Sequence, residues 1–247
     1  MNIIITMAGK GRRFIDAGYT LPKYQIEVCG QTLFSWAMES LRNFIAGKCN
    51  FIFITRKNDN AGPFIQKECK KKEIILYQIL ELETETDGQA TTALYAEKMI
   101  DDTDKPIAIY NIDTYVKSDF LHPDEIHGQG WIPCFPGQGD HWSFAKCDSN
   151  GRVVEVREKK RVSPHATIGF YWFESFQLYA DTYRKFYSDY SHIEAGERYI
   201  APMYNHLIKE GHEVFITEIP GQAVFGLGTP AEVEFFTTTF HDKILSS

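Results

Sequence analysis

Basic residues and glycines cluster directly after the first apolar run of the chain. The run Ile3–Ile5 leads into Ala8–Arg13, whose sequence is AGKGRR, and Pro22 and Lys23 follow. A strand that enters a glycine-rich turn commonly holds phosphate, because backbone N–H groups approach the oxygens closely and basic side chains supply counter-charge. These residues therefore predict a site that handles phosphate groups.

The two most familiar nucleotide-binding fingerprints do not fit this segment. The Rossmann fingerprint needs a third glycine at the position of Phe14. The Walker loop needs Gly-Lys followed by Ser or Thr, whereas Lys10 is followed by Gly11. The phosphate chemistry is therefore of another kind.

The same residues resemble the signature of the sugar nucleotidyltransferases, of which glucose-1-phosphate thymidylyltransferase is a familiar example. In that family a strand leads into Ala-Gly-x-Gly-x-Arg and a loop that ends in Pro-Lys, which Ala8–Arg13 and Pro22-Lys23 match. Further matching segments follow in the same order, at 88–90, 109–114, 158–159, 166–171, 196–200 and 228–230. The resemblance implies an enzyme that joins an NTP, with a pyrimidine base favoured, to a sugar 1-phosphate, giving NDP-sugar and pyrophosphate with Mg²⁺ as cofactor.

Asp113 is the candidate metal ligand, because it follows the apolar run 107–110 and ligands in α/β sheets gather at the carboxyl ends of strands. A turn-forming aspartate is the alternative for this segment. Three roles follow from the resemblance. The backbone of Ala8, Gly9 and Gly11 cradles the triphosphate. Arg13 neutralises the departing pyrophosphate, and Lys23 holds the α-phosphate and the incoming oxygen, so that Arg13, Lys23 and Asp113 are the expected catalytic residues.

The resemblance assigns further residues to the two substrates. Gly88 and Gln89 are expected to contact the nucleotide base, although Gly88 also suits a turn before a helix. Lys159 is expected to hold the acceptor phosphate and Glu158 a hydroxyl, against the alternative of a solvated charge run over 157–161. Gly169 is expected to face the acceptor, or else to mark a β-bulge or close strand packing.

One position departs from the family pattern. Thymidylyltransferase-like members carry a second metal-binding aspartate two residues before the late Gly-Thr, where this chain has Gly226. Three alternatives stay open: a cytidylyltransferase for a polyol or other non-sugar phosphate, a nucleotide-sugar glycosyltransferase, and a non-catalytic nucleotide-binding homologue. By family, the product is expected to serve capsule or other surface polysaccharide synthesis.

The elements that must position these residues alternate between strand and helix in the first half. Strands are predicted at 3–7, 51–54 and 107–110, helices at 32–44 and 90–100, and 74–80 is an apolar run of ambiguous period. This rhythm predicts a single α/β domain over 1–247, with a Rossmann-like, GT-A-type mixed and mainly parallel sheet flanked by helices. Residues 1–115 are the expected nucleotide-binding half and 116–247 the acceptor-binding half.

The second half adds strands that alternate apolar and polar residues. Asn150-Gly151 separates two of them, which predicts a β-hairpin. Thr229, Pro230 and Glu232 form a capping box at the start of the last helix. The expected strands are 142–146, 153–156, 166–173 and 213–219, and the other expected helices are 176–187 and 197–209.

Composition limits the function. The 247 residues carry a formal net charge of −7, which disfavours general affinity for nucleic acid or an anionic membrane. The five cysteines contain no CxxC pair, as expected of a reduced cytoplasmic chain without structural zinc. No apolar stretch approaches the roughly 20 residues that span a bilayer, and the chain shows no signal-peptide pattern. The partners expected are an NTP and a phosphorylated small molecule, with a homo-oligomer possible.

Overall fold

The computed structural model describes residues 1–244, and side chains for residues 1–240, so the last three residues of the expected domain 1–247 lie outside the described part. Fourteen strands are found in the described residues. They are β1 Asn2–Thr6, β2 Glu27–Val28, β3 Gln31–Thr32, β4 Asn50–Arg56, β5 Tyr77–Leu82, β6 Ile107–Asn111, β7 Thr114–Val116, β8 Gly130–Pro136, β9 Ser143–Cys147, β10 Val153–Glu158, β11 His165–Thr167, β12 Phe170–Phe173, β13 Val214–Glu218 and β14 Val224–Gly226.

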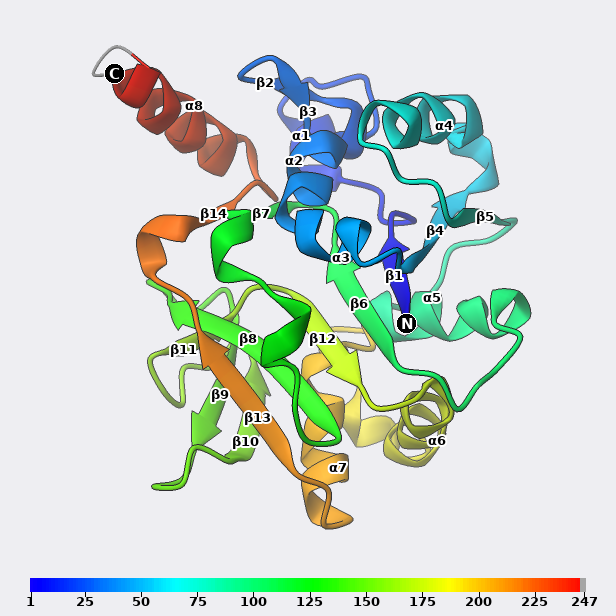
Figure 1. Cartoon of the computed structure of the whole chain (residues 1–247), viewed down its shortest axis with the longest axis vertical. Coiled ribbons are helices and arrows are strands. Elements are labelled where there is room, and N and C mark those ends of the chain that lie inside the picture. Colours follow the sequence, from blue (N-terminus) through cyan, green and yellow to red (C-terminus); the bar gives the residue numbers. More distant parts are fainter. Residues whose placement is uncertain (245–247) are drawn as a thin grey trace.

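Ten of these strands form the central sheet (Figure 1), in the order β10-β9-β11-β8-β12-β6-β1-β4-β5, with β13 beside β8. Strands β6, β1, β4 and β5 run parallel. The chain builds outward from β1 to β4 and β5, and then returns to place β6 on the other side of β1. The strand order thus reverses between β1 and β6, the kind of switch point where open α/β sheets bind ligands.

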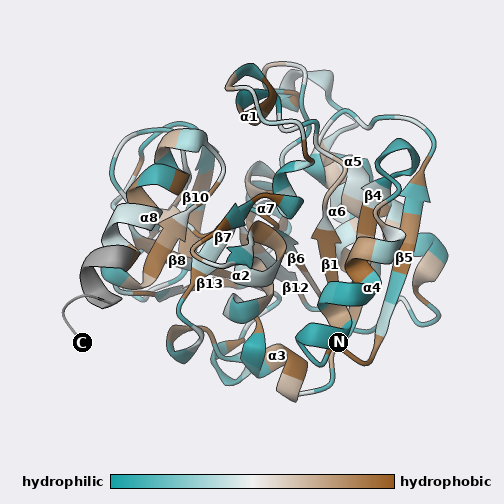
Figure 2. Cartoon of the chain, turned by 90° about the horizontal axis from the view of Figure 1, so that it is seen from above, coloured by the Kyte–Doolittle hydropathy of each residue, from teal (hydrophilic) through white to brown (hydrophobic). Residues whose placement is uncertain are grey.

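Helices cover both faces of this sheet. Figure 2 shows apolar strands between the more polar helices. Side chains of α2, α3 and α4 pack with Ile3, Ile5 and Phe51 on one face, whereas α5, α6 and α7 pack with Ile4 and Ile52 on the other. The α-helices are α1 Arg12–Asp16, α2 Leu33–Ser40, α3 Arg42–Ala46, α4 Gly62–Lys71, α5 Gln89–Leu94, α6 Phe176–Phe186, α7 Tyr204–Lys209 and α8 Pro230–Ile244. The predicted Rossmann-like mixed sheet flanked by helices is confirmed.

The second half extends the sheet with mostly antiparallel strands. β9 and β10 pair antiparallel around Asn150-Gly151, as predicted. β8, which no sequence pattern indicated, lies at the centre of this region and pairs with β11, β12 and β13. Its proline residues, Pro133 and Pro136, hid it from sequence reasoning, because proline within an apolar run weighs against a strand.

Several predicted boundaries are wrong, for local reasons. The helix expected over 32–44 divides at Leu41, whose N–H bonds three residues back to Met38 rather than four. The helix expected over 90–100 ends at Leu94 and tightens into a 3₁₀ turn. The strand expected over 166–173 divides at Gly169, whose φ of 76° is incompatible with a strand.

The helix expected over 197–209 begins only at Tyr204, after a 3₁₀ turn over Ala201–Met203. The backbone of Arg198 is used elsewhere: its N–H donates to the Asp87 carbonyl at 2.7 Å, and its carbonyl accepts from Ala90 at 3.0 Å. These long-range hydrogen bonds hold residue 198 beside residues 87–90, at the start of α5. They take the place of the helical bonds that the apolar spacing predicted.

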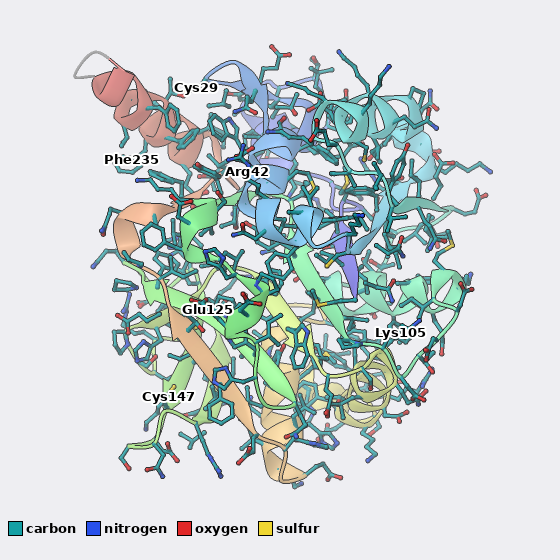
Figure 3. All side chains as sticks on the ribbon, in the orientation of Figure 1. Cys29, Arg42, Lys105, Glu125, Cys147 and Phe235 are labelled. Carbon is teal, nitrogen blue, oxygen red and sulfur yellow. The ribbon has the colours of Figure 1, made fainter. Side chains whose placement is uncertain are left out.

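All five cysteines are free thiols. Two of them, Cys29 near β2 and Cys147 at the end of β9, lie far apart in Figure 3. Within the described residues, no helix is both long enough and apolar enough to cross a membrane.

Candidate active site

The glycine-rich segment lies at the carboxyl end of β1 and turns into α1. Gly11 adopts a left-handed conformation with φ of 64°, and its carbonyl accepts from the N–H groups of Phe14 and Ile15. The apolar stem of Lys23 packs against Gly11, since a β-carbon at position 11 would lie 3.5 Å from its Cβ. Phe14 is buried and anchors α1, which leaves Arg12 and Arg13 exposed.

This segment lines a cavity of about 690 Å³. Other parts of the chain complete the wall: Lys23, the end of β6, residues 85–92 before and within α5, the turn around Gly196, and Gly228. Lys10 bridges the cavity edge through an ion pair of 2.9 Å with Glu85. The predicted residues on this lining are Ala8, Gly9, Gly11, Arg13, Lys23, Gly88, Gln89 and Asp113. The structure thus brings together every residue that the sequence assigned to the nucleotide.

Lys23 and Asp113 form an ion pair at the floor of this cavity. The Lys23 ammonium lies 2.7 Å from Oδ2 of Asp113, and both side chains are less than a quarter exposed. Burial alone would raise the pKa of Asp113, but the Lys23 charge and hydrogen bond outweigh it and lower that pKa below its usual value. Asp113 therefore carries an ionised carboxylate, the form that ligates a cation.

Gln89 and Gly88 are held by long-range contacts. The Gln89 amide donates to the Thr6 hydroxyl at 3.1 Å and to the Asn111 side-chain carbonyl, which ties α5 to the ends of β1 and β6. Gly88 has φ of 142°, and a β-carbon there would lie 2.4 Å from the Arg198 carbonyl oxygen. Glycine is required at position 88 because the chain at 198 passes directly over it.

A second cavity, of about 250 Å³, lies next to the first and contains the predicted acceptor residues. Glu158 and Ser143, on neighbouring strands β10 and β9, are hydrogen-bonded. Burial raises the pKa of Glu158, an effect that the Ser143 hydroxyl and the Lys159 charge only partly oppose. The Lys159 ammonium donates to the Tyr199 hydroxyl at 2.8 Å and lies 4.6 Å from the centre of that ring.

Gly169 connects β11 and β12 of the sheet and lines this second cavity. A β-carbon there would lie 2.3 Å from the side-chain nitrogen of Asn111, and the residue has a positive φ. The two cavities share one wall, made of Arg13, Gln89, Asn111, Asp113, Glu197 and Gly228. A molecule in one cavity is thereby adjacent to a molecule in the other, with Asp113 and Arg13 between them.

Comparison with known proteins agrees with this geometry. A family model described as nucleotidyl transferase matches residues 2–212. The nucleoside-diphosphate-sugar pyrophosphorylase from Vibrio cholerae RC9 has a crystal structure that is 34% identical, covering 96% of this chain and 100% of that one, with a TM-score of 0.88. The chain belongs to the nucleotidyl transferase family.

A more distant structure shares only the fold with this nucleotidyltransferase. It is the inositol-1-phosphate CTP transferase from T. maritima, 13% identical, covering 94% of this chain and 90% of that one, with a TM-score of 0.73. A comparison with curated protein sequences gave no match. The prediction that the chain is an enzyme of the nucleotidyltransferase class is confirmed.

Sequence reasoning missed several residues that line the second cavity of this nucleotidyltransferase. Glu232 had been assigned only to the capping box of the last helix, and Tyr199 only to a segment of family resemblance. Asn111 is the last residue of β6, and its place at the carboxyl end of a parallel strand is a signal that could have found it. The missed residues on the lining include Asn111, His141, Trp142, Ser143, Tyr171, Glu197, Tyr199 and Glu232.

Proposed function

We propose that this protein transfers a nucleotidyl group from an NTP, with a pyrimidine base, to a sugar 1-phosphate, giving NDP-sugar and pyrophosphate. An oxygen of the acceptor phosphate attacks the α-phosphorus, and the bond between that phosphorus and the bridging oxygen to the β-phosphate breaks. Pyrophosphate leaves with the electron pair. The observation that supports this proposal most strongly is the pair of adjoining cavities, which share Arg13 and Asp113 at the wall where the two phosphates would meet.

The residues of the first cavity suit the triphosphate. Both substrates are anions, so their approach must be aligned and their repulsion offset. The backbone of Ala8, Gly9 and Gly11 would cradle the phosphates, and Arg13 would offset charge on the leaving pyrophosphate. Lys23 would turn from Asp113 to the α-phosphate, because its ammonium lies beside Asp113, which lines both cavities. Gly88 and Gln89 would contact the base.

Asp113 suits magnesium as an ionised oxygen ligand. No group of three or more His, Cys, Asp or Glu residues among the described residues is arranged to hold a metal ion. Phosphate oxygens and water would therefore supply most of the coordination. Magnesium, when bound, would offset negative charge on the phosphates.

The second cavity suits an acceptor with several hydroxyl groups. Its lining carries the carboxylates of Glu158 and Glu197, and ionised carboxylates accept hydrogen bonds from hydroxyls. Lys159 would hold the acceptor phosphate and Gly169 would let the acceptor approach the sheet. The same chemistry suits a polyol phosphate, so a cytidylyltransferase for a polyol phosphate is the second candidate.

Pyrophosphate release separates these candidates. The purified protein is assayed with Mg²⁺ against each NTP in combination with a panel of sugar 1-phosphates and polyol phosphates. We expect release with one pyrimidine NTP and a sugar 1-phosphate. Release only with a polyol phosphate would favour the second candidate. No release from a folded protein that binds nucleotide would contradict both and favour a non-catalytic homologue.

A further inference from the structure

Gly226 stands where the family resemblance places a second metal-binding aspartate, and the structure explains what occupies that space. β14 pairs antiparallel with β7 so that Gly226 lies opposite Thr114, next to Asp113. The Leu227 N–H donates to the Asp113 carbonyl at 2.8 Å, which fixes this strand end beside the candidate metal ligand. Position 226 thus lies across the strand pair from the residue that directly follows Asp113.

A carboxylate from another element already fills the position. A β-carbon on residue 226 would lie 2.7 Å from Oε1 of Glu232 and 3.1 Å from the ring of Trp142. The first of these distances is shorter than real contacts of a β-carbon allow. Glycine at position 226 and the carboxylate of Glu232 are therefore complementary: the first makes room for the second.

Asp113 and Glu232 both place a carboxylate oxygen beside Gly228. A β-carbon on Gly228 would lie 3.1 Å from Oδ2 of Asp113 and 3.6 Å from Oε2 of Glu232. Both residues line the second cavity, and Gly228 also lines the first. One oxygen of each carboxylate thus lies near Gly228, at the wall where the nucleotide and acceptor phosphates would meet.

The first turn of α8 holds Glu232 in this place. Its N–H donates to the Thr229 hydroxyl at 3.2 Å, and that hydroxyl donates back to Oε2 at 3.0 Å. Oε1 has a more distant neighbour, His141, whose Nε2 lies 3.9 Å away. The helix cap therefore holds the carboxylate beside Gly226 and Gly228 and engages one of its two oxygens.

We propose that Glu232, from the first turn of α8, supplies the second carboxylate ligand of the divalent cation in place of the aspartate that Gly226 replaces. The proposal rests on the proposed nucleotidyl transfer and names the residue that completes its metal site. Glu232 and Asp113 would hold the cation together, with phosphate oxygens and water in the remaining positions, as suits a hard cation with oxygen ligands.

Mn²⁺ binding without substrate tests this assignment, through the electron paramagnetic resonance signal of the free ion. We expect Glu232→Gln to weaken Mn²⁺ affinity about tenfold, because one anionic ligand is lost. The glutamine can still accept from the Thr229 hydroxyl, so the cap and the fold are kept, which a thermal melt checks. Glu234→Gln, on the exposed side of the same helix, is the matched control and should bind Mn²⁺ like the wild type.

A variant that moves the carboxylate from position 232 to position 226 makes the test more specific. Glu232→Ala alone should weaken Mn²⁺ binding, and the double variant Glu232→Ala with Gly226→Asp should restore it, because removing Glu232 vacates the space that a side chain at 226 needs. Mn²⁺ affinity of E232Q equal to the wild type, with D113N weakened, would overturn the proposal. Pyrophosphate release by the wild type is measured in parallel. If the wild type releases pyrophosphate and E232Q binds Mn²⁺ normally, only the assignment of Glu232 is contradicted. If the wild type releases no pyrophosphate with any substrate, the proposed function is contradicted.

Discussion

The two adjoining cavities of this nucleotidyltransferase are built in different ways. The first takes much of its lining from one continuous segment, residues 8–13, at the end of a parallel strand, and its basic residues are close in sequence. The second collects side chains from the ends of β6, β9, β10 and β11, from the turn around Tyr199 and from the start of α8. Only the first cavity is therefore marked by a contiguous motif in the sequence.

Their charges differ as well. The first cavity carries as many cations as carboxylates: Lys10, Arg12, Arg13 and Lys23 against Glu85, Asp87, Asp113 and Glu197, and Lys10 and Lys23 are paired with two of these carboxylates. The second carries more carboxylates than cations: Asp113, Glu158, Glu197 and Glu232 against Arg13 and Lys159. A polyphosphate suits the first, and a molecule with hydroxyl groups and a single phosphate suits the second. The comparison teaches that a phosphate loop is local, whereas acceptor recognition depends on tertiary structure.

The comparison predicts that loss of a cation between the cavities has the largest effect. Arg13→Ala should lower kcat roughly 10²- to 10³-fold, because a charge that stabilises the departing pyrophosphate is removed. Arg13 is exposed, so the melting temperature should hardly change. Arg184→Ala, on the surface of α6, is the control for loss of an exposed arginine. Unchanged turnover of R13A would remove Arg13 from the proposed machinery.

The glycines that allow close approach should matter next, and for folding rather than chemistry. Gly169→Ala should reduce the free energy of unfolding by about 2–3 kcal/mol, because the new β-carbon meets Asn111 and the positive φ is strained. Gly62→Ala, where neither constraint applies, should be neutral or slightly stabilising. Urea unfolding measures both. Equal stability of the two variants would show that the Gly169 contact relaxes at no cost.

A smaller effect should be confined to the second cavity. Glu158→Gln should raise the KM for the acceptor about tenfold, since a hydrogen bond to a charged group is weakened, and leave the KM for the NTP unchanged. Glu155→Gln, on the same strand outside the cavity, is the matched control. A change in the NTP KM of E158Q would contradict the assignment of this carboxylate to the acceptor side.

The pH dependence of the acceptor KM should give the smallest difference between the acceptor cavity and the nucleotide cavity. The raised pKa of Glu158 means that this carboxyl takes up a proton at a higher pH than an ordinary glutamate, whereas Asp113, with its lowered pKa, stays ionised. The acceptor KM should therefore rise as the pH falls, and the rise should begin at a higher pH than the titration of an ordinary glutamate would give. The profile for E158Q should lack this rise and keep only the change that comes from the acceptor phosphate, whose second pKa is about 6. If the acceptor KM of E158Q and of the wild type changed with pH in the same way, the effect would belong to a group other than Glu158.

The sequence predicted the parts of this molecule that depend on neighbours along the chain. The glycine loop, the hairpin at Asn150-Gly151 and the position of Asp113 after β6 are of this kind. Lys23 and Asp113 meet because both follow the carboxyl ends of adjacent parallel strands, which the alternation of strand and helix implied. The division of the chain into a nucleotide half and an acceptor half stays a prediction, as do the cytoplasmic location and the role in surface polysaccharide synthesis.

The rest depended on contacts between distant segments. Arg198 was expected in a helix, but its backbone bonds to Asp87 and Ala90, more than a hundred residues earlier. Glu232 has the sequence features of a helix cap, and only the absence of a side chain at Gly226 shows why its carboxylate has room at the end of β14. Such pairings arise from tertiary packing, for which a single sequence carries no periodic signal.

The reverse reaction tests the central claim most directly. The protein is incubated with labelled pyrophosphate, Mg²⁺ and, in turn, a panel of NDP-sugars and CDP-polyols, and labelled NTP is measured. The account predicts labelled NTP and a phosphorylated acceptor in equal amounts from one of these compounds, and none without pyrophosphate. Release of NDP without pyrophosphate, with no NTP from any compound, would contradict nucleotidyl transfer and indicate a glycosyltransferase.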